Sequence, residues 1–113
     1  MRLNEYQELS KRTFPANKGQ SISVKEKNLA NYGMGISGEA GEVTDLLKKC
    51  LFHGHKLERE EVIKELGDVM HYVAGIAYMF DTSLEEVATA NIEKLRKRYP
   101  DGFSMEASVN RED

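Results

Sequence analysis

The sequence predicts an all-α fold: a four-helix bundle that associates through its helices and occupies residues 1–113 as a single domain. Apolar residues recur every three or four positions over long stretches, which is the spacing of one helix face. β-Branched and aromatic residues nowhere alternate with polar ones over a useful length, so strands are not indicated. The chain contains no internal repeat, low-complexity linker or change of composition, which favours one domain.

Four helical stretches follow from these apolar residues and from the residues that begin and end helices. The first is short because Pro15 interrupts it, and a capping box that starts at Ser83 begins the fourth. The tail after Phe103 is expected to be loosely ordered. The stretches cover about residues 3–13, 25–51 and 58–81, and from the cap at Thr82 or Ser83 to the stop at Tyr99.

Glycines are unusually frequent in the second stretch, at Gly33, Gly35, Gly38 and Gly41. Each costs about 1 kcal/mol relative to alanine in a helix interior. Four of them in one helix indicate that another backbone or a ligand comes close, and a kink near Gly33 is an alternative.

The composition limits the classes of partner and compartment. Charged residues make up 31% of the chain and hydrophobic residues 40%, which is typical of a folded, soluble protein. The formal net charge of −3 argues against duplex nucleic acid as a partner. Cys50 is the only cysteine, so no internal disulfide can form and a reducing compartment is favoured. Without a signal-peptide core or a membrane-length apolar run, we expect a cytoplasmic protein with no membrane partner.

Carboxylates stand in or beside the apolar stripes where core residues are expected. Glu39 lies on the stripe of the second stretch, and Glu42 follows it by one helical turn. In the third stretch Glu65, Asp68 and Tyr72 form a line one residue behind the apolar line, so they border the core. The sequence therefore places two acidic pairs on successive helices that should pack antiparallel: Glu39 with Glu42, and Glu65 with Asp68.

Carboxylates at a buried boundary repel one another and need compensation. Because only carboxylate oxygens are offered, the suitable partner is a hard cation, Mg²⁺ or, as a substitute, Mn²⁺. Acidic pairs on helices also occur as ordinary solvated faces. The pattern alone leaves both interpretations open.

Taken together, these segments resemble a known superfamily. Residues 38–43 (GEAGEV) and 64–69 (KELGDV) resemble the paired motif of the MazG-like all-α nucleoside triphosphate pyrophosphohydrolases. Residues 91–100 (NIEKLRKRYP) are similar to the closing segment of that family, with its asparagine, lysine and arginine. The opening residues 3–7 (LNEYQ) are similar to the start of short, single-domain members, so the resemblance covers nearly the whole chain.

The resemblance implies an Mg²⁺-dependent hydrolysis of a nucleoside triphosphate to the monophosphate and pyrophosphate, in nucleotide-pool house-cleaning. It also implies a homodimer or homotetramer whose pocket takes residues from two subunits. The implied metal ligands are Glu39, Glu42, Glu65 and Asp68, with Glu42 as the candidate general base. The implied substrate-binding residues are Tyr72, Asn91, Lys94, Arg98 and one of Lys48 and Lys49.

Other interpretations of the same residues remain. The carboxylates could serve a non-catalytic helical regulatory module that binds Mg²⁺ or a nucleotide without turnover. Asp68-x-x-His71 is similar to half of a di-iron site, but such bundles use two Glu-x-x-His motifs. His53 and His55 lack cysteine partners and fit a loop better than a zinc site. No motif selects a base or a sugar.

Overall fold

The computed structural model describes residues 1–111 and confirms the all-α prediction. Within that range no β-strand forms, and the only extended pairing is an isolated bridge between Pro100 and Gly102. Residues 112 and 113 of the predicted domain lie outside the described part. The elements are α1 (Leu3–Ser10), the 3₁₀ turn η1 (Lys11–Thr13), α2 (Ile22–His53), α3 (Arg59–Met79), α4 (Leu84–Arg98) and α5 (Met105–Val109).

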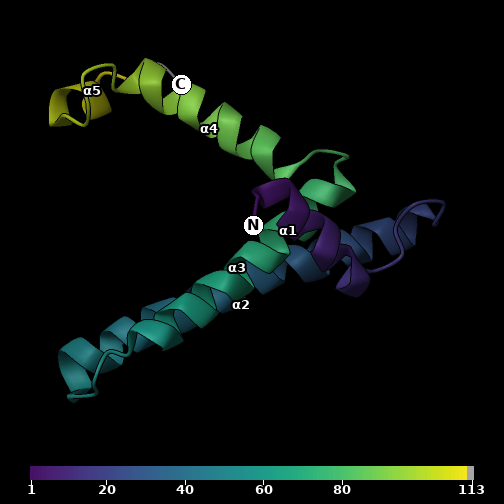
Figure 1. Cartoon of the computed structure of the whole chain (residues 1–113), viewed down its shortest axis with the longest axis horizontal. Coiled ribbons are helices and arrows are strands. Elements are labelled where there is room, and N and C mark those ends of the chain that lie inside the picture. Colours follow the sequence, from purple (N-terminus) through teal and green to yellow (C-terminus); the bar gives the residue numbers. More distant parts are fainter. Residues whose placement is uncertain (112–113) are drawn as a thin grey trace.

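The two longest helices, α2 and α3, lie side by side as an antiparallel hairpin (Figure 1). The α2 helix begins earlier than predicted because the Ser21 hydroxyl accepts a hydrogen bond from the Val24 N–H, at 3.2 Å. It ends at His53 and is capped by Gly54, whose φ of +73° is a left-handed conformation that favours glycine. The helix continues without interruption past Gly33.

Two glycines of the hairpin provide space for tyrosines of the opposite helix. A Cβ atom at Gly35 of α2 would overlap the ring of Tyr72, and one at Gly75 of α3 would overlap the ring of Tyr32. The two rings meet edge to face with centroids 5.0 Å apart. The close approach predicted for the α2 glycines therefore occurs at Gly35, where the neighbour is a side chain. The other three have no such neighbour: Gly33, Gly38 and Gly41 have nothing within 4 Å.

We expect Gly75→Ala to lower the free energy of unfolding by about 1–3 kcal/mol, because the added methyl group must displace the Tyr32 ring. Gly33→Ala is the matched control, since the same methyl group would enter open space. That change should raise the free energy of unfolding by up to about 1 kcal/mol through helix propensity alone. Urea unfolding followed by circular dichroism measures both. Equal effects of the two substitutions would show that the Tyr32 contact does not constrain the hairpin.

The fourth helix, α4, does not complete a compact bundle within one chain. The beginning of α4 contacts α1 and the end of α3 (Figure 1). The rest of α4 runs away from the hairpin, and α5 lies at its far end. The radius of gyration is 17.2 Å, whereas a compact domain of 100 residues has about 13 Å. One chain is therefore an open arrangement of helices.

The open arrangement leaves few residues of the predicted apolar stripes fully buried. The buried apolar side chains are few: Tyr32, Ala74, Ala77 and Leu84. Met34 is 69% exposed and Leu66 52% exposed, although both belong to helices whose apolar stripes predict burial. Exposed apolar area on this scale is typical of surfaces that another molecule covers.

The C-terminal segment differs from the sequence prediction. The tail after Phe103 was expected to be loosely ordered, and this is wrong for residues 105–109, which form α5. The Ser104 hydroxyl caps this short helix by accepting from the Ala107 N–H at 3.0 Å. None of the helices found in residues 1–111 combines the length and apolarity needed to cross a membrane.

Candidate metal centre

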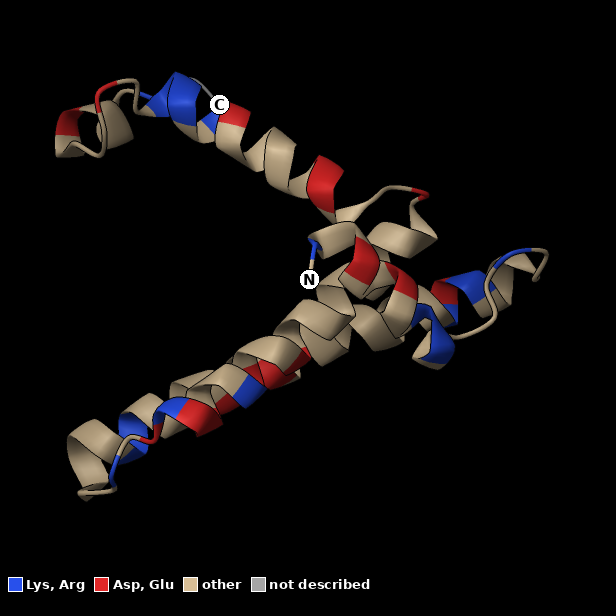
Figure 2. Ribbon diagram, viewed as in Figure 1, with Lys and Arg blue, Asp and Glu red and all other residues tan. Residues whose placement is uncertain are grey.

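Three of the four predicted metal ligands converge across the α2–α3 hairpin. One carboxylate oxygen each from Glu39, Glu65 and Asp68 lie within 4.8 Å of one another. The antiparallel pairing brings the acidic turn of α2 beside the acidic turn of α3, as Figure 2 shows partway along the hairpin. Glu65 and Asp68 are three residues apart and so share one side of α3.

The neighbouring charges that shift the pKa of Glu65 are all carboxylates. Partial burial raises the pKa of Glu65 above its ordinary value. The negative charges of Asp68, Glu39 and Glu42, in that order, raise the pKa of Glu65 further. A hydrogen bond between Glu65 and Glu39 has the same effect. These repulsions are what a bound cation would relieve.

The donor set fits a hard divalent cation. All the converging atoms are carboxylate oxygens, which Mg²⁺ and Mn²⁺ prefer. Oxygens bound to Mg²⁺ at about 2.1 Å can lie at most about 4.2 Å apart. The oxygens of the trio lie within 4.8 Å, so small side-chain rotations suffice to bring them together. Open space at Gly38 and Gly41 leaves the adjoining surface of α2 accessible to a ligand.

The fourth predicted ligand, Glu42, lies outside the converging trio. Its side chain is exposed, whereas Glu39 one turn earlier is half-buried. Its charge is nevertheless close enough to raise the pKa of Glu65. The arrangement is therefore three carboxylates at the centre and a fourth beside them.

Tyr72, predicted to lie against a nucleotide, is part of the packing between the two helices. Its half-buried ring lies over Gly35 and contacts Tyr32 edge to face. His71 lies in the same aromatic cluster, with its ring 5.5 Å from that of Phe14 and 5.9 Å from that of Tyr32. The sequence stripe did not reveal this cluster, since Phe14 belongs to a loop far from α3 along the chain.

Lys48 and Lys49 both bind the same carboxylate of α2. Lys48 Nζ lies 3.4 Å from Asp45 Oδ1, and Lys49 Nζ lies 2.8 Å from Asp45 Oδ2. The hydrogen bond from Lys49 is the main cause that lowers the pKa of Asp45. Exposed ion pairs of this kind contribute little to stability, so either lysine can turn toward a phosphate at small cost.

The predicted substrate residues of α4 do not meet the carboxylates within one chain. Asn91 and Lys94 are exposed, and Arg98 is half-buried with its guanidinium 5.9 Å from the ring of Tyr99. Figures 1 and 2 show why: α4 points away from the hairpin, and the basic end of this helix is far from the acidic turns.

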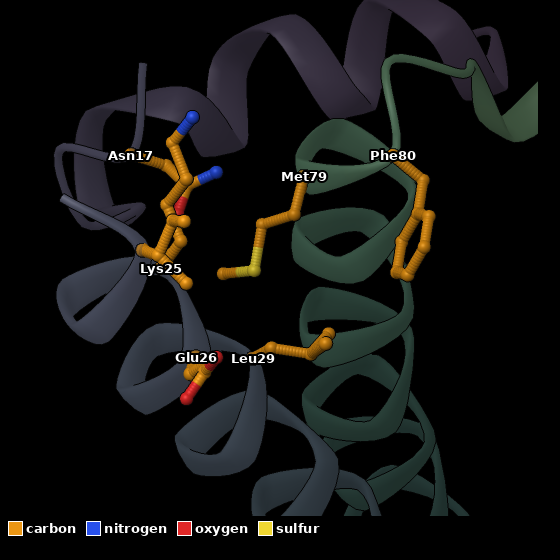
Figure 3. Close-up of a pocket in the computed structure, with 7 residues that line it drawn as sticks. Asn17, Lys25, Glu26, Leu29, Met79 and Phe80 are labelled. Atoms are coloured by element: carbon orange, nitrogen blue, oxygen red, sulfur yellow. The ribbon is translucent and has the colours of Figure 1, made fainter. Parts of the chain in front are cut away.

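A separate apolar groove lies between the first turns of α2 and the last turns of α3 (Figure 3). The Met79 side chain reaches from α3 toward α2, and Leu29 reaches from α2 toward α3. Leu29 precedes Glu39 by ten residues, which is about 15 Å along a helix. The groove is therefore distinct from the acidic trio. Its lining consists of Asn17, Ile22, Lys25, Glu26, Leu29, Met79 and Phe80.

Comparison with known proteins gives a family match over most of the chain. The model of the MazG nucleotide pyrophosphohydrolase domain matches residues 27–103, which include both acidic pairs and all of α4. The chain is similar to the Gene 37 protein of Mycobacterium phage L5, at 36% identity over 89 residues covering 75% of this chain and 78% of that protein. It is also similar to the uncharacterized protein YvdC of Bacillus subtilis (strain 168), at 45% identity over 42 residues, 37% of this chain and 40% of that protein. No solved structure matches the chain.

Proposed function

Because the chain belongs to the MazG nucleotide pyrophosphohydrolase family, we propose that it hydrolyses a nucleoside triphosphate to the monophosphate and pyrophosphate. The observation that carries this proposal is the convergence of the Glu39, Glu65 and Asp68 oxygens within 4.8 Å. Together with the repulsion that Glu65 experiences from its acidic neighbours, this convergence favours a site for Mg²⁺ and a polyphosphate. The role we assign is house-cleaning of the nucleotide pool in the cytoplasm.

Each carboxylate has a part in this chemistry that follows from its position. Glu39, Glu65 and Asp68 would hold Mg²⁺, or Mn²⁺ in its place. The bound ion would supply charge neutralisation for the triphosphate and lower the pKa of a water molecule. Glu42 lies beside the trio with an exposed carboxylate, which suits a group that accepts a proton from the attacking water. Attack of this water at the α-phosphorus would form the monophosphate and release pyrophosphate.

The positive groups that this reaction needs are on α4, and we propose that they arrive through self-association. A triphosphate at the acidic trio needs donors such as Lys94 and Arg98 to balance the charge of the leaving pyrophosphate. Since α4 turns away from its own hairpin, a second copy is the simplest source of these side chains. The exposed apolar residues of the hairpin and of α4, among them Leu66 and Ile92, favour the same association.

We expect incubation with Mg²⁺ to convert at least one of the eight common nucleoside triphosphates to its monophosphate and pyrophosphate. Ion-exchange chromatography of the products identifies both, and a parallel reaction with EDTA should show no loss of triphosphate. Orthophosphate and a diphosphate as main products would contradict attack at the α-phosphorus. Binding of a triphosphate without turnover in any reaction would favour the regulatory-module alternative.

We expect the protein to sediment as a dimer or tetramer at micromolar concentration, because a single chain leaves large apolar residues such as Leu66 and Ile92 exposed. Sedimentation equilibrium measures the mass directly. An active monomer would contradict both the assembly and a pocket shared between subunits.

A further inference from the structure

The side chain of Gln7, on α1, is buried at the corner where α3 passes into α4. It is 6% exposed and is the one buried polar residue among residues 1–111. Its Nε2 donates to the carbonyl oxygens of Ala74, at 3.3 Å, and Thr82, at 3.0 Å. Its Oε1 accepts from the N–H of Leu84, at 3.1 Å. One amide thus joins the N-terminal helix to both sides of the corner.

The first turn of α4 depends on α1 for its hydrogen bonds. The first N–H groups of a helix have no partner within the helix itself. Here the N–H of Leu84 donates to Gln7, and the N–H of Glu85 donates to Asn4 Oδ1 at 3.0 Å. The next N–H, that of Glu86, donates to the hydroxyl of the usual capping residue, Ser83. Two of these three backbone groups are therefore satisfied by side chains of α1.

Beyond its first turn, α4 is mostly exposed to solvent. Leu84 is 5% exposed, but Val87 is 40% and Ile92 46% exposed, and the helix leaves the other elements (Figure 1). The corner also contains Asp81 with a φ of +56°, a conformation that is uncommon for residues other than glycine. The direction of α4 is therefore fixed at its first turn.

We propose that Gln7, together with Asn4, is a positioning residue: it fixes the direction in which α4 presents Asn91, Lys94 and Arg98. The amide is suited to this role because it donates and accepts at once. A glutamate at the same position would lose the donors to two carbonyl groups, and a methionine of similar length would lose all three bonds. The effect on substrate binding rests on the proposed function, whereas the effect on the direction of α4 does not.

Distances between spin labels test the direction of α4 without reference to activity. In a Cys50→Ser background, labels at Lys64→Cys and Lys97→Cys report the position of α4 relative to the hairpin. Labels at Lys27→Cys and Lys64→Cys report the hairpin alone. Labelled chains are diluted into excess unlabelled protein so that distances between subunits do not contribute. Circular dichroism selects a temperature at which every variant is folded.

We expect Gln7→Met to broaden the Lys64–Lys97 distance distribution at least about two-fold and to leave the hairpin distribution narrow. Gln20→Met is the matched control in an exposed loop, and it should change neither distribution. An unchanged Lys64–Lys97 distribution in folded Gln7→Met would overturn the proposal and leave Gln7 a stability residue only. If Gln7→Met does not fold, Asn4→Ala removes one bond, and the same two outcomes decide.

Kinetics of the same variants give the catalytic consequence. Because α4 carries groups that bind the substrate and balance the charge of the leaving pyrophosphate, Gln7→Met should lower kcat/KM about ten-fold or more, and Gln20→Met should leave it unchanged. An unchanged kcat/KM in folded Gln7→Met would contradict positioning through α4. If the parent hydrolyses no triphosphate at all, the proposed function fails, and the distance measurements still decide the role of Gln7.

Discussion

Replacing Glu65 with glutamine should reduce triphosphate hydrolysis by about 100-fold or more, and yet leave the metal-free protein at least as stable as the parent. Glutamine keeps the shape of the side chain and removes its charge. Loss of groups that merely orient metal ligands lowers activity by about 10- to 100-fold, so loss of a ligand should cost more. Stability moves the other way because the charge removed is one that its neighbours repel.

Mg²⁺ should narrow or reverse the difference in melting temperature between the two proteins. With EDTA, the melting temperature of Glu65→Gln should equal or exceed that of the parent. With millimolar Mg²⁺ the parent should gain more, since it alone keeps the full ligand set and binding to the native state adds stability. Thermal melts of both proteins under both conditions provide the four values. A metal-free mutant that melts well below the metal-free parent would show that Glu65 is a structural partner and not a ligand.

The pH dependence of the metal-free melts follows from the raised pKa of Glu65. The folded state holds this proton more tightly than the unfolded state, so ionised Glu65 destabilises the fold at pH above its folded pKa. This unfavourable contribution is relieved as the pH falls through that value toward the ordinary value of 4.5. The advantage of Glu65→Gln over the parent should therefore be largest at neutral pH and shrink on acidification.

Glu61→Gln provides the matched control for the charge change. Glu61 is exposed, lies one turn before Glu65 on α3 and is not among the charges that raise the pKa of Glu65. Because it lies in the first turn, where a negative charge is favourable, its removal should lower stability slightly. Activity should stay close to that of the parent.

The parts of this structure that sequence periodicity predicted are those that one helix, or one pair of adjacent helices, determines. The 3.6-residue period fixes which side of α3 carries Glu65 and Asp68, and a short connector makes α2 and α3 antiparallel. Those two facts suffice to bring Glu39 to the same place. The cap at Ser83 was likewise predictable, because a hydroxyl that caps the third amide after it is a local feature.

The parts that were not predicted depend on contacts distant in sequence. The capping box of α4 is only half formed, since the Glu86 carboxylate accepts from the Thr82 hydroxyl while side chains of α1 serve the first two amides. Tyr72 faces Gly35 because the two helices happen to cross there, which the stripe of either helix alone does not reveal. The direction of α4 is set by Gln7, from 75 residues or more away in sequence.

Mixing two inactive variants should restore activity if α4 of one chain serves the hairpin of another. Glu65→Gln removes a carboxylate from the hairpin, and Lys94→Ala removes the amine from α4. In a mixed dimer, one pocket would carry both defects and the other would carry neither. Random reassociation gives mixed dimers as about half of the population, so the mixture should recover about a quarter of the parent activity.

The assay needs exchange of subunits and a control for it. The two variants are combined in mild denaturant, refolded together and compared with each variant refolded alone at the same total concentration. A third mixture of Glu65→Gln with Asp68→Asn has both defects on the hairpin, so its mixed dimers contain no intact pocket and should stay inactive. Recovery requires the Lys94 amine and the intact acidic trio to come from different chains of the dimer. It therefore distinguishes a shared pocket from association without sharing. Mixed dimers of Glu65→Gln and Lys94→Ala that form but remain inactive would show that each pocket uses its own α4, which would then have to fold back onto its own hairpin.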